Sequence, residues 1–194
     1  MTCNDPKRPK INQNSPQTIL WTYIVDALFH PLNPKFQQTP LYHLQMWDQQ
    51  THCYCLSTCL QKMKRWSLEN PDHSPIVIMM EPKGLPGAED SYTINNEIEL
   101  SDILAVEQEI LNVIGSDSLI TPDSIRENNG KSLTESLKTR GWPSIYDMKG
   151  TFMFAWWDGD KIREKYETGT NGLKGRLIFT IKYVSDWAYM VFFF

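Results

Sequence analysis

Short runs of apolar residues alternate along this chain with longer stretches in which apolar side chains recur every three or four positions. The short runs are rich in β-branched and aromatic residues and predict strands, whereas the longer spacing predicts helices that bury one face. The predicted strands are Thr18–Leu28, which ends near Asp26, Leu41–Met46, Pro75–Met80, Thr151–Trp157 and Gly175–Ile181. Strands separated by helices indicate βα units, in which right-handed crossovers join parallel strands.

The helices are marked by their apolar spacing and by residues that cap helix ends. Ser132-Leu-Thr-Glu135 has the pattern of a capping box, and Thr121-Pro122-Asp123 fits an N-cap followed by the first two helical positions. The predicted helices are Leu56–Leu68, Leu100–Ile114, a short helix after Thr121 and another after Ser132. This order predicts an α/β fold, and the chain is short beside the ~250 residues of a typical closed α/β barrel.

Length and composition fit one globular domain. The 194 residues can bury one substantial core, and a formal net charge of −4 gives no overall basic footprint for nucleic acid. No apolar run reaches the ~18 residues of a transmembrane helix, and the polar start has no segment typical of a signal peptide. We expect a polar segment over 1–17, a partial barrel domain over 18–181 and an apolar tail over 182–194.

Three of the four cysteines lie within seven residues. The C-x-C-x3-C pattern of Cys53, Cys55 and Cys59 could belong to a zinc knuckle, but no matching second half occurs elsewhere in the sequence. A local disulfide between Cys53 and Cys59 is favoured if the protein is exported, and plain thiols remain the alternative.

Ionisable residues follow the predicted strands at the places where α/β barrels build their sites. His43 follows one apolar strand and could move a proton. Asp26 ends another strand, and Glu81 with Lys83 closes a third; carboxylates suit a hard cation, and lysine suits phosphate. Taken alone, the same residues also fit a solvated histidine, a turn-capping aspartate and a Glu81–Lys83 salt bridge.

The remaining histidines and the tryptophans fit ordinary structural roles. The histidines in polar stretches, expected to be solvated, are His30, His52 and His73. Tryptophans that could stack on a sugar or inositol ring, but more often pack in a core or at its rim, are Trp142, Trp156, Trp157 and Trp187.

A combination of motifs carries a family resemblance. Each motif alone is a weak signal, but their combination and spacing are specific to one family. The motifs are the run YHLQMWDQQTHC, the triplet EPK, the stretch LITPDSIRENNG, the phrase RGWP and the segment GRLIFT. Over roughly Tyr23 to Thr180, the sequence resembles calcium-dependent phosphatidylinositol-specific phospholipase C enzymes of the secreted microbial type. The resemblance implies an α/β-barrel fold, a phosphoinositide or related phosphodiester substrate, transient contact with a membrane surface and secretion.

The resemblance also implies roles for individual residues. Asp26 and Glu81 match carboxylates at the family's calcium, and Lys83 matches a phosphate contact. His43 matches one of two catalytic histidines, which act as general acid and base. Ca²⁺ is therefore the expected cofactor.

The sequence departs from the family pattern at two places. Ile24 stands where the family has a calcium-side glutamate, and the Thr-His-Asn-Ser phrase that carries the family's first catalytic histidine is absent from these 194 residues. We therefore expect a truncated chain with an incomplete barrel, an incomplete calcium site and weak activity. Two alternatives stay open: a non-catalytic relative that binds phosphorylated head groups, and a glycerophosphodiester phosphodiesterase. The second is disfavoured because its usual His-Arg-Gly opening is absent.

Overall fold

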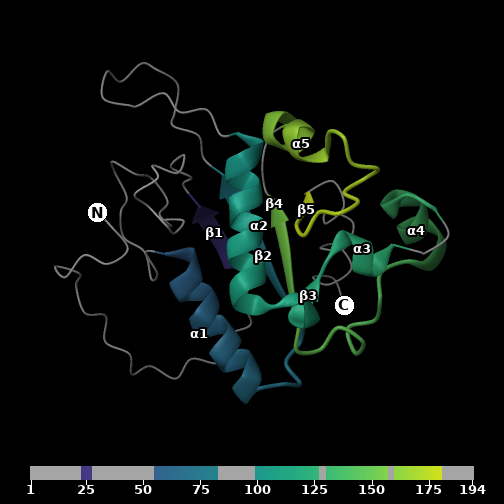
Figure 1. Cartoon of the computed structure of the whole chain (residues 1–194). Helices are drawn as coiled ribbons and strands as arrows, with labels where there is room; N and C mark the ends of the chain where they lie inside the picture. Colours follow the sequence, from purple (N-terminus) through teal and green to yellow (C-terminus); the bar gives the residue numbers. More distant parts are fainter. Residues whose placement is uncertain (1–22, 28–54, 83–98, 127–129, 157–159, 181–194) are drawn as a thin grey trace, which may run out of the picture.

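A computed structural model describes residues 23–27, 55–82, 99–126, 130–156 and 160–180, with side chains except at 23–27, 81–82 and 160–162. Within these ranges, helices and parallel strands alternate (Figure 1). In chain order the elements are β1 (Tyr23–Ala27), α1 (Leu56–Glu69), β2 (Ile76–Pro82), α2 (Leu100–Ile114), a 3₁₀ turn (Ser116–Ser118), β3 (Leu119–Ile120), α3 (Pro122–Ile125), α4 (Leu133–Arg140), β4 (Phe152–Trp156), α5 (Asp160–Glu167) and β5 (Phe179–Thr180).

The strands form one sheet in which every pairing is parallel. The order is β1-β2-β4-β3, and β5 also pairs with β4. β4 pairs with β2 along its full length, with β3 through Phe152 and Met153, and with β5 through Ala155 and Trp156. The prediction of parallel βα units is therefore confirmed for the described strands.

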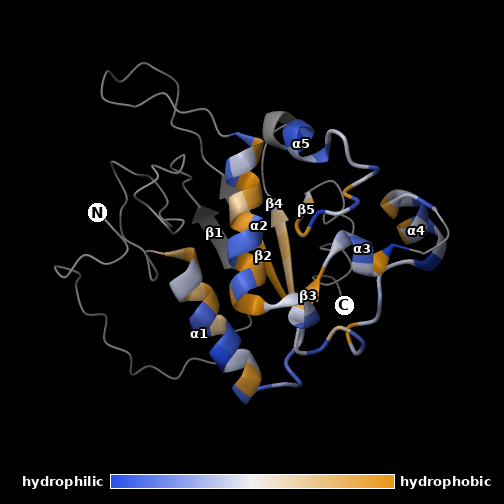
Figure 2. Cartoon of the chain, in the orientation of Figure 1, coloured by the Kyte–Doolittle hydropathy of each residue, from blue (hydrophilic) through white to orange (hydrophobic). Residues whose placement is uncertain are grey.

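The two long helices lie side by side and run in the same direction. Near the start of α1, the Ser57 backbone N–H donates to Glu109 Oε1 of α2 at 2.9 Å. About two turns further along α1, Lys64 Nζ donates to the Ile114 carbonyl at the end of α2 at 2.7 Å. Figure 2 shows the apolar stripe of α2, and its buried side chains are Ile103, Val106, Ile110 and Ile114. This arrangement is that of successive βα units.

Alternate residues of β4 face opposite sides of the sheet, and ring contacts identify the helix-covered side. The Phe152 ring lies 5.7 Å from the His73 ring, which lies 5.1 Å from the Trp66 ring of α1. At the other end of β4, the Trp156 ring meets the Tyr166 ring of α5 edge-on at 6.3 Å. Because side chains alternate along a strand, Phe152 and Trp156 lie on the helix face and Met153 and Ala155 on the opposite face. All five side chains of β4 are buried.

The predicted helix caps are confirmed. Thr121 and Ser124 form a capping box at α3, and Ser132 and Glu135 form one at α4. None of the helices in the described part of the chain is both long and apolar enough to cross a membrane.

The last predicted strand is much shorter than expected. Of Gly175–Ile181, only Phe179 and Thr180 pair with β4, because the preceding backbone N–H groups bind carboxylates instead. Gly175 N donates to Asp123 Oδ2 at 2.8 Å, and Leu177 N donates to Glu107 Oε1 at 2.5 Å. Helix α5 and strand β3 were not predicted. The predicted strand Leu41–Met46 and the segments 1–17 and 182–194 lie outside the described residues.

Candidate functional site

Asp26 and Glu81 are neighbours across two parallel strands. They are register partners in the β1–β2 pairing, and each is the next-to-last residue of its strand. Neighbouring strands lie ~4.8 Å apart, so the two backbone positions adjoin at the carboxyl edge of the sheet. This is the edge at which the sequence placed the candidate site.

Strand alternation assigns this pair of positions to a face of the sheet. The preceding register row contains Met80, which pairs with Trp156, and Trp156 packs on α5. Positions 26 and 81 lie one residue further along their strands, so they belong to the opposite face. That face is turned away from the α5 contact, as a site at the mouth of a barrel would be.

The row beneath this pair on the same face is apolar. Ile24 is in register with Met79, Met79 with Ala155, and Ala155 with Phe179. Met79 is 6% exposed, and Ala155 and Phe179 are fully buried. Position 24, where the family pattern has a carboxylate, is thus in register with a row of buried apolar residues.

The other predicted site residues lie outside the described residues. They are His43, Lys83 and Cys53. Among the residues whose side chains the structure describes, no group of three His, Cys, Asp or Glu residues has a geometry suited to a metal ion.

Cys59 is disulfide-bonded, and so is Cys55. The zinc-knuckle and free-thiol alternatives are therefore wrong for these two residues. The predicted Cys53–Cys59 pairing stays a prediction.

His73 lies in the loop between α1 and β2, as expected, but it is half-buried and hydrogen-bonded rather than simply solvated, which corrects that part of the expectation. Its Nδ1 lies 2.6 Å from the Ser74 carbonyl oxygen and its Nε2 lies 2.8 Å from Ser67 Oγ. A carbonyl only accepts, so Nδ1 carries the hydrogen and donates it. Packed between Trp66 and Phe152, the ring joins α1 to the start of β4.

The described tryptophans of the predicted cluster pack in the interior. Trp156 is 2% exposed against Tyr166, and the half-buried Trp142 ring lies 5.5 Å from the Phe179 ring. The packing reading is correct for both residues.

Glu107 of α2 anchors the approach to β5, a role that the sequence did not indicate. Its carboxylate accepts hydrogen bonds from the Tyr166 hydroxyl and the Leu177 amide, and Ile178 N also lies 3.3 Å from it. Burial, followed by the nearby Glu107 charge, raises the pKa of Tyr166 above its usual range. The phenol therefore stays protonated and acts as a permanent donor. Sequence spacing alone carries no signal of a contact between residues so far apart.

Comparisons with known proteins agree with this fold. A family described as "Phosphoinositide phospholipase C, Ca2+-dependent" matches residues 29–186, a range that includes His43, Glu81 and Lys83 and begins just after Asp26. A calcium-dependent phosphoinositol-specific phospholipase C from a Gram-negative bacterium, Pseudomonas sp, is similar in structure. Its crystal form 2 gives a TM-score of 0.54 at 20% identity over 74% of this chain and 48% of that one. Crystal form 1 gives a TM-score of 0.52 at 18% identity over 74% and 49%.

This chain thus spans about half the length of the solved structures that it matches. No curated protein matches it.

Proposed function

Because this chain belongs to the calcium-dependent phosphoinositide phospholipase C family, we propose that it carries part of a phosphodiesterase site at the carboxyl edge of its sheet. The substrate is a phosphoinositide or a related phosphodiester. The observation that carries the proposal is the register of Asp26 with Glu81, because it brings two carboxylate-bearing positions together at one strand edge.

Asp26 and Glu81 fit a calcium ion. Ca²⁺ takes roughly 6–8 oxygen ligands and accepts carboxylates readily. When bound, the ion supplies positive charge that stabilises the phosphoryl oxygens. The apolar row beneath the pair, with Ile24 in register with Met79, offers no further carboxylate, so we expect weak calcium binding.

His43 and Lys83 complete the proposal. His43 acts as an acid or base, taking a proton from the attacking hydroxyl or giving one to the leaving oxygen. Lys83 lies two residues beyond Glu81 in the sequence, and its ammonium would contact the phosphate group. A positioned acid or base typically contributes ~10²–10⁴-fold in rate.

The fold and the cysteines support two further parts of the proposal. The all-parallel sheet with helices on one face is consistent with part of a barrel of the phospholipase C type. Disulfide bonds at Cys55 and Cys59 favour an oxidising compartment, as in a secreted protein.

The test is a phosphodiesterase assay with a soluble monomeric inositol phosphodiester, with and without calcium. Calcium-dependent turnover should disappear in His43→Ala and persist in His52→Ala, a control for loss of a histidine in the same part of the sequence. Turnover that persists in His43→Ala, or that ignores calcium, would contradict the proposed site. Head-group binding without any turnover would favour the non-catalytic alternative.

A further inference from the structure

An Asn-Gly pair lies in the loop between α5 and β5. Asn171 is exposed, Gly172 follows it, and neither residue belongs to a helix or a strand. Glycine has no Cβ beside its backbone nitrogen, so this nitrogen can approach the carboxamide of the preceding asparagine without a steric barrier. The pair therefore suits an attack of the main chain on its own side chain, a reaction that needs no cofactor and no enzyme.

The other described asparagines lack these features. Asn70 precedes Pro71, whose backbone nitrogen carries no hydrogen and cannot act as the nucleophile. Asn112 is exposed, but it lies inside α2 and precedes the β-branched Val113. The helical hydrogen bonds and the branched side chain both hinder the approach of the nitrogen. Among the described asparagines, the surroundings of Asn171 thus favour the reaction most.

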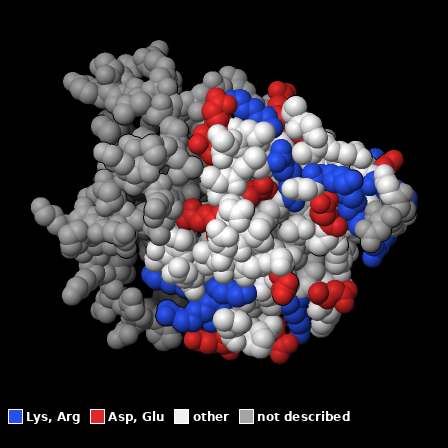
Figure 3. All heavy atoms as spheres, in the orientation of Figure 1, with Lys and Arg blue, Asp and Glu red and all other residues white. Residues whose placement is uncertain are grey.

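The charges near the pair also favour the reaction. The exposed Lys174 lies three positions after Asn171, and the Arg126 guanidinium donates to the Gly172 carbonyl. Figure 3 shows basic groups gathered on this side of the molecule and acidic groups along α2. Positive charge nearby stabilises the negative charge that develops on the attacking nitrogen and on the carboxamide oxygen. In the resting turn the Gly172 N–H donates to the Thr170 carbonyl at 2.9 Å, so the turn must open before the attack.

We propose that Asn171 is a site of spontaneous deamidation, an inference that does not depend on the proposed function. The Gly172 nitrogen loses its proton and bonds to Asn171 Cγ, while the Cγ–Nδ2 bond breaks and ammonia leaves with that proton. The product is a succinimide ring, which water opens at one of its two carbonyls. Breaking the new bond leaves aspartate at position 171. Breaking the original peptide bond leaves isoaspartate, in which the main chain runs through Cγ.

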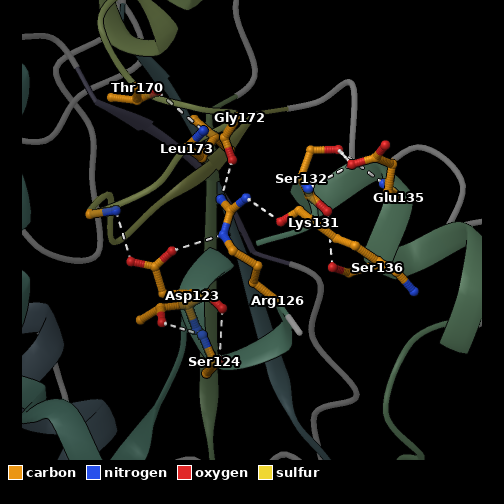
Figure 4. A network of polar contacts seen from close by, with 12 residues as sticks. Asp123, Ser124, Arg126, Lys131, Ser132, Glu135, Ser136, Thr170, Gly172 and Leu173 are labelled. Atoms are coloured by element: carbon orange, nitrogen blue, oxygen red, sulfur yellow. Dashed lines mark hydrogen bonds and ion pairs between the residues drawn. The ribbon is translucent and has the colours of Figure 1, made fainter. Parts of the chain in front are cut away.

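The isoaspartate product lengthens the main chain inside a tightly held turn. Leu173 is fully buried and has a φ of +63°, which makes it the one described residue other than glycine in the left-handed region. Figure 4 shows its N–H donating to Thr170 Oγ1, at 3.2 Å, across the Asn-Gly pair. Gly175 N donates to Asp123 Oδ2 at 2.8 Å. An added methylene must displace at least one of these contacts, so the residues that lead into β5 should open more often.

The test is peptide mapping by mass spectrometry while the folded chain is incubated at mildly alkaline pH, where the amide nitrogen loses its proton more readily. The deamidated fraction at Asn171 should exceed that at Asn112 several-fold, and electron-based fragmentation should identify isoaspartate among the products. Asn171→Gln should abolish the reaction at this position, because the longer side chain would have to close a larger ring. Asn112→Gln, the matched control, should leave the reaction at Asn171 unchanged.

Hydrogen–deuterium exchange tests the structural consequence. After incubation, the amides of Leu177 and Ile178 should exchange faster in the unaltered chain than in Asn171→Gln. Asn171→Asp adds the negative charge and keeps the main-chain length, so its exchange at these amides should match that of the fresh chain.

Each of the following outcomes would overturn the proposal. Asn171 that stays intact in the folded chain but reacts in the urea-denatured chain would show that the turn protects it. Equal deamidated fractions at Asn171 and Asn112 would remove the effect of the glycine. Isoaspartate at position 171 without faster exchange at Leu177 and Ile178 would show that the turn accommodates the longer main chain.

Discussion

Asp26 lies directly across from Glu81 on the neighbouring parallel strand, one residue before each strand ends. If both carboxylates bind calcium, neutralising either one should weaken binding. We expect Asp26→Asn and Glu81→Gln each to lower calcium affinity by at least about tenfold, the smaller of the losses typical of changes near a metal. Isothermal titration calorimetry measures this, and Glu69→Gln, exposed at the end of α1, is the control. Unchanged affinity in both variants would remove the calcium site from this edge.

Ile24 is in register with Met79, two residues before the carboxylate pair and on the same face. A glutamate at position 24 would add an oxygen donor, so Ile24→Glu should raise calcium affinity. It should also lower stability in the absence of calcium, since a charge in an apolar row is costly unless it is paired. Calorimetry and thermal unfolding with and without calcium test both effects. A variant that loses stability and gains no affinity would show that position 24 does not face the ion.

The Tyr166 hydroxyl joins α5 to α2 and to the residue before β5, donating to Glu107 and accepting from Ile178 N at 3.0 Å. Tyr166→Phe keeps the buried ring and removes both bonds. The Ile178 amide loses one partner, so we expect a loss of about 1–3 kcal/mol in the free energy of unfolding. Urea denaturation measures it. Tyr146→Phe is the matched control because Tyr146 is 80% exposed, and an equal loss in both variants would contradict the role of the network.

Gly150 has a φ of +71°, and a Cβ added there would lie 2.5 Å from the Pro71 carbonyl oxygen. Gly169 has a similar φ of +75°, with nothing within 4 Å of its added Cβ. Both alanine variants bear the ~1–2 kcal/mol cost of a left-handed backbone. Gly150→Ala should therefore lower the melting temperature clearly more than Gly169→Ala, the difference reporting the contact between the α1–β2 connection and the start of β4. Equal melting-temperature shifts in the two variants would show that the methyl group added at position 150 is accommodated beside Pro71 without a further loss of stability.

Glu135 provides a pH test of a helix cap. The backbone N–H of Ser132, and then its hydroxyl, hold the pKa of the Glu135 carboxyl below its ordinary value. A depressed folded-state pKa stabilises the fold above the unfolded pKa, and this contribution disappears as pH falls through the folded value. In Ser132→Ala the backbone donor remains, so the Glu135 pKa should rise only partway, as followed by carbon NMR. A Glu135 pKa that does not move would show that the hydroxyl has no part in the shift.

Local chemistry made most of the described fold predictable. The apolar spacing of α1 and α2 and the capping residues at Thr121 and Ser132 act within a few residues, so their signals survive in sequence alone. Strand β5 was overestimated because Asp123 and Glu107, distant in the sequence, take the amides that would have extended it. The sequence of α5 is highly charged and has few apolar residues, so it showed no apolar spacing from which a helix could be predicted.

The candidate site was predictable only in part. Because parallel strands end at one edge of a sheet, the sequence predicted that Asp26 and Glu81 lie at the same edge. That the two residues are direct register partners is known only from the pairing of β1 with β2. His73 was misread because the two rings and the serine that enclose it come from other elements. The roles of His43 and Lys83 depend on the family resemblance and stay predictions.

The unequal pairing of the strands has a consequence for hydrogen–deuterium exchange. β4 is bonded to three strands and wholly buried, so its amides should exchange only when the whole domain unfolds. Among the described strands, β1 is paired with β2 alone, so its amides should open in smaller, more frequent fluctuations. Asp26 would then separate from Glu81 without global unfolding, and a bound cation bridging the two would slow exchange at β1 more than anywhere else in the sheet.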